Sequence, residues 1–116
     1  MRPPPMTGIS THVLDTSLGR PAEGVPVGLA VRTEDGWQPL GSTATNADGR
    51  AEGLPAVPAN SVVRLVFDTA AYFARTSEDP PFFPEVSVVL TIAPAQHHYH
   101  VPLLLNPFGY SVYRGS

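Results

Sequence analysis

Four histidines are the side chains of this chain that can act as bases near neutral pH without a shifted pKa. Their positions in the sequence indicate which of them lie on strands and which in a loop. His12 lies in residues 9–14, where apolar and polar residues alternate as they do in a half-buried strand. His98 and His100 are two residues apart in a second stretch of this kind, so a strand would carry both imidazoles on one face. His97 is expected in a loop. The spacing predicts positioned imidazoles of the kind that activate water.

The tetrapeptide Tyr113, Arg114, Gly115 and Ser116 ends the sequence with further reactive groups. A guanidinium can hold two planar oxygen atoms at once, and the serine carries a hydroxyl beside the chain carboxylate. Chain ends are usually frayed and polar, whereas this one follows the apolar residues 101–105. We therefore expect the tail to be held in place, where these groups could serve a site that also contains a base.

Arg50 is a third candidate, because it directly follows the turn-forming cluster at residues 46–49. A side chain that leaves a tight turn has a fixed direction, and a guanidinium there could hold substrate oxygens. An arginine in a loop is more commonly a plain surface residue, and a single histidine on a strand is more commonly a surface or packed side chain. The case for chemistry therefore depends on several of these residues lying together.

A metal site is an alternative use of the histidines. His12, His98 and His100 could supply the three imidazoles of a catalytic zinc site with an open position for water. Zinc-bound imidazoles usually donate their other N–H to a carboxylate or carbonyl oxygen, and residues 97–100 have no Asp or Glu as sequence neighbours. We therefore expect no metal and keep zinc as the less favoured alternative.

Fourteen prolines and ten glycines divide the 116 residues into short segments, which excludes long helices almost everywhere. Between these breakers, period-two alternation predicts strands, and Asp68 as an N-cap predicts one or two turns of helix over residues 69–74. Seven or eight short strands at this spacing favour an all-β, two-sheet sandwich with one short helix. The predicted strands are residues 9–14, 25–31, 37–45, 50–54, 62–67, 86–92, 99–105 and 110–114.

Composition narrows the class of partner. The chain has no cysteine, and its seven basic residues, all arginine, are scattered against ten acidic ones, for a formal charge of −3. This pattern is no nucleic-acid footprint. No apolar run approaches the length of a membrane span, so we expect a cytoplasmic protein with neither nucleic-acid nor membrane partners.

One domain is expected, formed by residues 7–116, with residues 1–6 as a disordered N-terminal segment. Leu103, Leu104 and Leu105 are consecutive, so the strand that holds them must carry apolar side chains on both faces. A strand buried on both faces predicts a contact with another subunit.

Several segments then form a recognisable set: HVLDT at 12–16 with GRPA at 19–22, TNADGR at 45–50, FPEV at 83–86, and YHVPLLLNPFGYSVYRGS at 99–116. Together they resemble the 5-hydroxyisourate hydrolases of the transthyretin-like family. The resemblance covers essentially the whole chain after residue 6, and the closing tetrapeptide is the family's diagnostic mark. Transthyretin itself, the hormone carrier of the same fold, lacks that ending and the histidine pair. Asn46 and Asn106 stand where the family commonly has Asp and Ser, and neither is a catalytic position.

The resemblance implies a transthyretin-like sandwich that assembles as a homotetramer, with active sites in a channel at the dimer–dimer interface and with neither a metal nor an organic cofactor. The residues that match the catalytic positions are His12, Arg50, His100 and Ser116. Tyr113 and Arg114 would belong to the tail that shapes the substrate-binding site, and His98 would be a supporting residue beside it.

The implied activity is hydrolysis of 5-hydroxyisourate to 2-oxo-4-hydroxy-4-carboxy-5-ureidoimidazoline in urate catabolism. His12 and His100 would orient and deprotonate the water that attacks a ring amide carbonyl. Arg50 would hold the substrate oxygens, and Ser116 would hydrogen-bond the water or the substrate. Two other classes stay open: a non-enzymatic carrier of small planar ligands, and an immunoglobulin-type interaction sandwich, which would need none of these residues.

Overall fold

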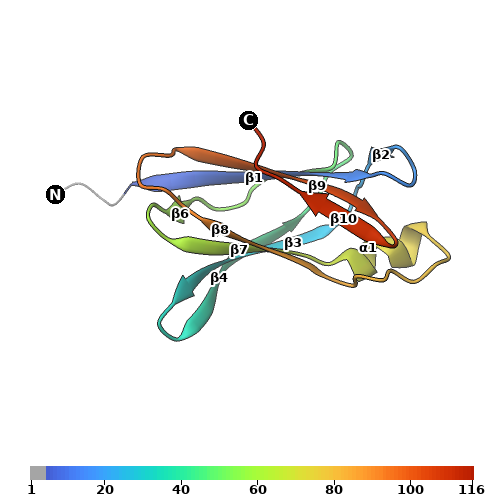
Figure 1. Cartoon of the computed structure of the whole chain (residues 1–116), viewed down its shortest axis with the longest axis horizontal. Coiled ribbons are helices and arrows are strands. Elements are labelled where there is room, and N and C mark those ends of the chain that lie inside the picture. The colour runs from blue at the N-terminus through green and yellow to red at the C-terminus, as the bar shows by residue number, and fades with distance from the viewer. Residues whose placement is uncertain (1–4) are drawn as a thin grey trace.

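Two sheets pack face to face in the computed structural model, which describes residues 5–116 (Figure 1). The six-stranded sheet runs in the order β10 (Gly109–Val112), β9 (His98–Asn106), β1 (Met6–Asp15) and β2 (Arg20–Pro21), and β5 (Arg50–Ala51) and β6 (Val57–Pro58) also pair with β1. The four-stranded sheet runs in the order β4 (Gly36–Ala44), β3 (Pro26–Thr33), β7 (Val62–Phe67) and β8 (Val86–Thr91).

The predicted all-β sandwich with one short helix is confirmed, although the strands are more numerous than predicted. The two-residue strands β2 and β6 were not expected, because each is too short to show alternation. The strand expected over residues 50–54 ends at Ala51. Gly53, which has a φ of 83°, turns the chain away from the ladder there.

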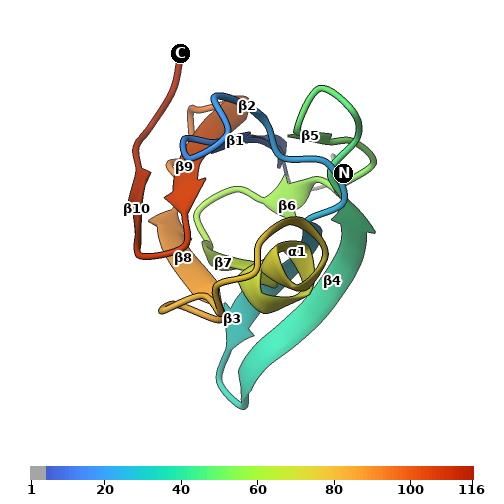
Figure 2. The ribbon, with the colours of Figure 1, turned by 90° about the vertical axis from the view of Figure 1, so that its right-hand side faces the viewer.

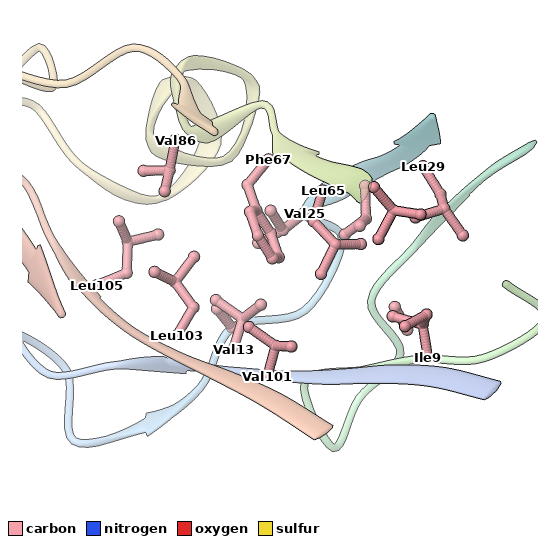
Figure 3. Packing of buried hydrophobic residues seen from close by; sticks show 14 of the residues in the cluster. Ile9, Val13, Val25, Leu29, Leu65, Phe67, Val86, Val101, Leu103 and Leu105 are labelled. Carbon is pink, nitrogen blue, oxygen red and sulfur yellow. The ribbon is translucent and has the colours of Figure 1, made fainter. Parts of the chain in front are cut away.

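The core forms where the two inner faces meet. Val13 and Leu103 of the larger sheet point toward Leu65 and Phe67 of the smaller one, and all four side chains are fully buried (Figure 3). Burial of one such side chain stabilises the fold by about 1.5–3 kcal/mol. The alternation predicted for residues 25–31 is confirmed, since its apolar positions belong to this core.

Strands β1 and β9 pair in parallel, whereas the other ladders are antiparallel. Their register aligns Ser10 with His100 and Val13 with Leu103. The odd-numbered residues of β1 from Thr7 to Asp15 are buried. The even-numbered residues of both strands therefore share the outer face of the sheet, which is where the predicted imidazoles lie.

Helix α1 (Thr69–Thr76) lies across one end of the sandwich (Figure 2) and confirms the predicted helix. The carboxylate of Asp68 accepts a hydrogen bond of 3.0 Å from the backbone N–H of Ala71, as an N-cap does. The helix buries Tyr72, whose hydroxyl donates to a carboxylate oxygen of Asp15 at 2.6 Å. This bond fastens the helix to the end of β1.

The Asp15–Tyr72 pair has shifted pKa values. Burial by itself raises the pKa of the Asp15 carboxyl, but hydrogen bonds from Ser17, Tyr72 and two backbone N–H groups outweigh it and hold that pKa below its usual value. Burial and the neighbouring carboxylate raise the pKa of the Tyr72 hydroxyl to about 12. The pair is therefore a carboxylate and a neutral phenol at pH 7.

Strand β1 begins inside the segment that was expected to be disordered. Met6 is the first residue of β1 and pairs with Pro58, and the carbonyl oxygen of Pro5 accepts a 3.0 Å hydrogen bond from the backbone N–H of Ala59. Residues 1–4 of the segment expected to be disordered lie outside the described residues.

Within residues 5–116, no helix has the length and apolar character that crossing a membrane requires.

Replacement of Tyr72 by Phe removes the hydroxyl that contacts the Asp15 carboxylate. We expect the free energy of unfolding at pH 7 to fall by about 1–3 kcal/mol, the cost of a lost hydrogen bond to a charged group. A lowered carboxyl pKa stabilises the fold above about pH 4 and loses that contribution as the pH falls through the folded pKa. The difference between Y72F and wild type in urea denaturation should therefore narrow from pH 7 to pH 3, and an equal loss at both pH values would contradict the assignment.

Candidate functional site

A hollow of about 520 Å³ lies on the outer face of the six-stranded sheet. It is formed by β1, β5, β9 and the C-terminal tail, which follows β10 (Figure 1) and hydrogen-bonds to β9. Most of its side chains are polar, and its lining residues are Ser10, His12, Leu14, Arg50, His98, His100, Pro102, Tyr113, Gly115 and Ser116. Segments far apart in the sequence thus meet at one place.

His12 and Arg50 are neighbours across the β1–β5 ladder. Nε2 of His12 lies 2.7 Å from the carbonyl oxygen of Asp48. A carbonyl can only accept, so Nε2 must carry the proton, and the neutral ring keeps its lone pair on Nδ1. This bond fixes the tautomer of His12 and connects the strand to the turn that precedes Arg50.

The turn at residues 46–50 holds the arginine in place. The side-chain oxygen of Asn46 accepts hydrogen bonds of 3.0 Å from the backbone N–H groups of both Asp48 and Arg50. An Asp at position 46 would offer the same acceptor, which explains why the change to Asn leaves the turn intact. Gly49 has a φ of 78°, and a Cβ there would collide with the carbonyl oxygen of Val13.

His98 and His100 lie on one face, as predicted, and a third side chain connects them. The Oγ atom of Ser10 is 2.8 Å from Nε2 of His98 and 2.8 Å from Nδ1 of His100. His98 is exposed, and His100 is half-buried. His97 is exposed outside any strand, as expected for a loop residue.

The pKa of His100 is lower than the ordinary imidazole value of 6.5. Burial is the largest cause, followed by the nearby charge of Arg50 and by His12 and His98. Each of these disfavours the protonated ring. His100 is therefore neutral at pH 7 and has a lone pair available to accept a proton.

The tail is fastened beside His100. The backbone N–H of Gly115 donates a 2.8 Å hydrogen bond to the carbonyl oxygen of His100. A Cβ at position 115 would lie only 2.7 Å from Cδ2 of the His100 ring and 3.1 Å from Pro102, so glycine is needed for this approach. The predicted fixed tail is thus present, and it brings Ser116 to the hollow.

Arg114 points elsewhere. Its guanidinium carbon lies 4.8 Å from the ring centroid of Tyr99, a cation–π geometry. This stacking takes the side chain out of the hollow and toward an apolar recess beside Leu90 and Val112. In this chain Arg114 acts as an anchor of the tail, and the substrate contact expected of it stays a prediction.

The predicted site residues are otherwise assembled in the hollow: His12, Arg50, His98, His100, Tyr113 and Ser116. The residue that sequence reasoning missed is Ser10, although its place on the same strand face as His12 was evident from alternation. Across residues 5–116, no three His, Cys, Asp or Glu side chains are grouped as metal ligands. The zinc alternative for His12, His98 and His100 therefore has no support in the geometry.

The model of the HIUase/Transthyretin family matches residues 9–115. The chain belongs to this family. It is 42% identical to the 5-hydroxyisourate hydrolase of Deinococcus radiodurans over 94% of this chain and 96% of that protein. Among solved structures it is similar to the 5-hydroxyisourate hydrolase of Klebsiella pneumoniae, with 38% identity, a TM-score of 0.82, and coverage of 96% of this chain and all of that one.

The same family also includes a similar structure with a different name. Transthyretin from Sparus aurata has 32% identity and a TM-score of 0.85, and the match covers 92% of this chain and 95% of that one. Similarity of fold within the HIUase/Transthyretin family therefore does not by itself distinguish a hydrolase from a transthyretin. The distinction has to come from the residues of the hollow.

The turn before Arg50 can be tested with a pair of glycine substitutions. Gly53→Ala is the matched control, because Gly53 has a φ of 83° but an added Cβ would meet no atom within 4 Å, so it should cost only about 1–2 kcal/mol of backbone strain. Gly49→Ala adds the collision with Val13 and should cost at least twice as much in urea denaturation. Equal losses in the two variants would contradict the tight packing of this turn.

Proposed function

We propose that this protein hydrolyses 5-hydroxyisourate to 2-oxo-4-hydroxy-4-carboxy-5-ureidoimidazoline in urate breakdown. The observation that carries the proposal is the gathering of three imidazoles, a guanidinium and two serine hydroxyls in one hollow. Membership of a family that contains 5-hydroxyisourate hydrolases names the substrate. The hollow supplies the groups that a cyclic amide hydrolase needs.

The water-activating base is assigned to the imidazoles. His100 is neutral at pH 7, because burial and the neighbouring cation lower its pKa. When the His12 ring is neutral its lone pair is on Nδ1, since Nε2 donates to the turn. Together the rings orient one water molecule and remove its proton as its oxygen attacks the ring carbonyl of the substrate.

Charge that develops on the attacked carbonyl oxygen needs a fixed cation. Arg50 follows a turn that Asn46 and Gly49 hold in one shape, so the point at which its side chain leaves the backbone is fixed before substrate arrives. Such preorganised charge stabilises a transition state more than mobile charge does. Ser116 hydrogen-bonds the water or the substrate from the opposite side of the hollow.

A non-enzymatic carrier is the alternative function. Pockets that hold apolar or planar ligands are lined mainly by hydrophobic and aromatic side chains. In this hollow most lining side chains are polar, and only Leu14, Pro102 and Gly115 lack a polar side chain. The lining therefore favours hydrolysis over carriage.

Hydrolysis can be followed as the ultraviolet decay of 5-hydroxyisourate generated by urate oxidase. We expect wild type to accelerate the decay, and His100→Asn or deletion of Ser116 to slow it by about 100-fold or more, as loss of general-base or positioning groups does. His97→Asn is the matched control, because that exposed ring lies outside the hollow. A chelator should change nothing. A wild-type rate equal to the spontaneous rate would exclude the hydrolase.

A homotetramer is proposed as the working assembly, in the cytoplasm. Strands β10 and β8 end their sheets on the same side of the sandwich (Figure 2), and both edges are open to pairing. Val89 on β8 is 55% exposed, and Phe108, in the turn before β10, is 69% exposed. Further copies would cover these groups and enclose the hollow, which in one chain lies on an open sheet face.

Sedimentation velocity tests the assembly. We expect a particle of about four times the 12.4 kDa chain mass at micromolar concentration. His100→Asn should sediment identically, since His100 contributes a reactive group to the hollow and not to the sheet edges. A wild-type monomer would contradict the proposed tetramer.

A further inference from the structure

Ser10 lies between His98 and His100, and the proposed hydrolysis assigns it no role. We propose that Ser10 and His98 form a proton relay behind His100, in which the Ser10 hydroxyl sets the tautomer of His100 and passes its surplus proton to His98. The water-activating step that the relay would serve rests on the proposed function. The tautomer of His100 can nevertheless be measured without substrate or activity.

The hydroxyl of Ser10 has a single proton and two imidazole neighbours at 2.8 Å. It can donate to at most one ring nitrogen, so at least one of the two rings must donate to it. When His100 donates from Nδ1 and Ser10 donates to Nε2 of His98, Nε2 of His100 keeps its lone pair. When the order is reversed, Nε2 of His100 carries the proton and cannot serve as a base. The two rings are therefore coupled through Ser10.

Proton transfer along this chain is balanced. When Nε2 of His100 takes a proton from water, the proton on Nδ1 moves to Oγ of Ser10 as the serine proton moves to Nε2 of His98. Ser10 ends neutral, His100 ends neutral with its proton on Nε2, and His98 carries the positive charge. The Nε2 proton is then available for the leaving ring nitrogen, and the reverse shift through Ser10 returns His98 to its neutral form.

The electrostatics of the hollow favour this movement. Burial and the charge of Arg50 make a protonated His100 unfavourable. Arg50 pairs with His12, which lies opposite Pro102 of β9. His98 is the first residue of β9, two residues or about 6.6 Å before His100 and on the side away from His12. His98 is also exposed. The relay therefore moves positive charge away from the guanidinium and into solvent contact.

The position of the His98 ring is built into two strands. Gly8 pairs with His98 across the β1–β9 ladder, and a Cβ on Gly8 would lie only 2.7 Å from Nδ1 of that ring. Glycine therefore lets the ring lie against β1, where Nε2 reaches Ser10. The side-chain N–H of Gln96 also donates a 3.1 Å hydrogen bond to the carbonyl oxygen of His98.

Other ionisable groups share this face and belong in the interpretation of any pH profile. They are His12 of β1, Arg50 of β5, His100 of β9 and Tyr113 of the tail. Among residues 5–116, the side chain that hydrogen-bonds both His98 and His100 is Ser10.

Nitrogen-15 NMR of the imidazoles tests the tautomer without any substrate. In wild type we expect a protonated Nδ1 and an unprotonated Nε2 on His100, and an unprotonated Nε2 on neutral His98. Ser10→Ala should abolish the Nδ1–H preference of His100, and Ser10→Thr, which keeps the hydroxyl, should restore it. A wild-type His100 protonated on Nε2, or a spectrum unchanged in S10A, would overturn the relay.

Kinetics give the second measurement. We expect S10A to lower kcat by about 10- to 100-fold with KM changed less than about twofold, because the variant loses a proton path and no substrate contact. Ser10→Thr should recover most of kcat, and Ser42→Ala, on the other sheet, is the matched control. Wild-type kcat in S10A would overturn the relay. An inactive wild type would refute only the hydrolase, since the tautomer measurement stands without activity.

Discussion

Parallel pairing of β1 with β9 is the constraint on which the rest of the structure depends. It aligns Val13 with Leu103 on the inner face, where both side chains pack in the core between the two sheets. The same register sets Ser10 beside His100 on the outer face. Side chains alternate with a period of two, so a slip of one residue would bury the imidazoles and expose the apolar row. The hydrophobic core therefore fixes the positions of the reactive groups without touching them.

Two irregular segments complete the site, and each relies on a glycine where the backbone comes very close to a neighbour. Gly49 packs against the carbonyl of Val13 and positions Arg50, and Gly115 packs against the His100 ring and positions Ser116. Loops and chain ends are normally the most mobile parts of a domain. Here backbone hydrogen bonds to the rigid sheet make them precise enough to serve as walls of a hollow.

One sandwich is shared by proteins of different names in the HIUase/Transthyretin family, so the fold is a scaffold and the function has to be argued from the residues of the hollow. Within a single chain that face leaves the His98 ring exposed and the His100 ring only half-buried. A reaction that stabilises developing charge benefits from excluding water. Assembly through the open edges at β8 and β10 would supply that exclusion, which links oligomerisation to chemistry.

The sequence by itself determined most of the fold and the candidate residues, because both follow from short-range patterns. Alternation located the long strands and placed His98 and His100 on one face, and the N-cap Asp68 located the helix. Two-residue strands such as β2 carry too few positions to show a period, and they were missed.

Tertiary structure decided which distant residues meet. The sequence contains no signal that β1 and β9 pair in parallel, because their partner choice depends on how the whole core packs. That pairing placed Ser10 between His98 and His100, and the path of the tail turned Arg114 onto Tyr99 and away from the hollow. The alternation of side chains along each strand and the residue types thus determine what each side chain can do. Long-range packing determines which other groups each side chain meets.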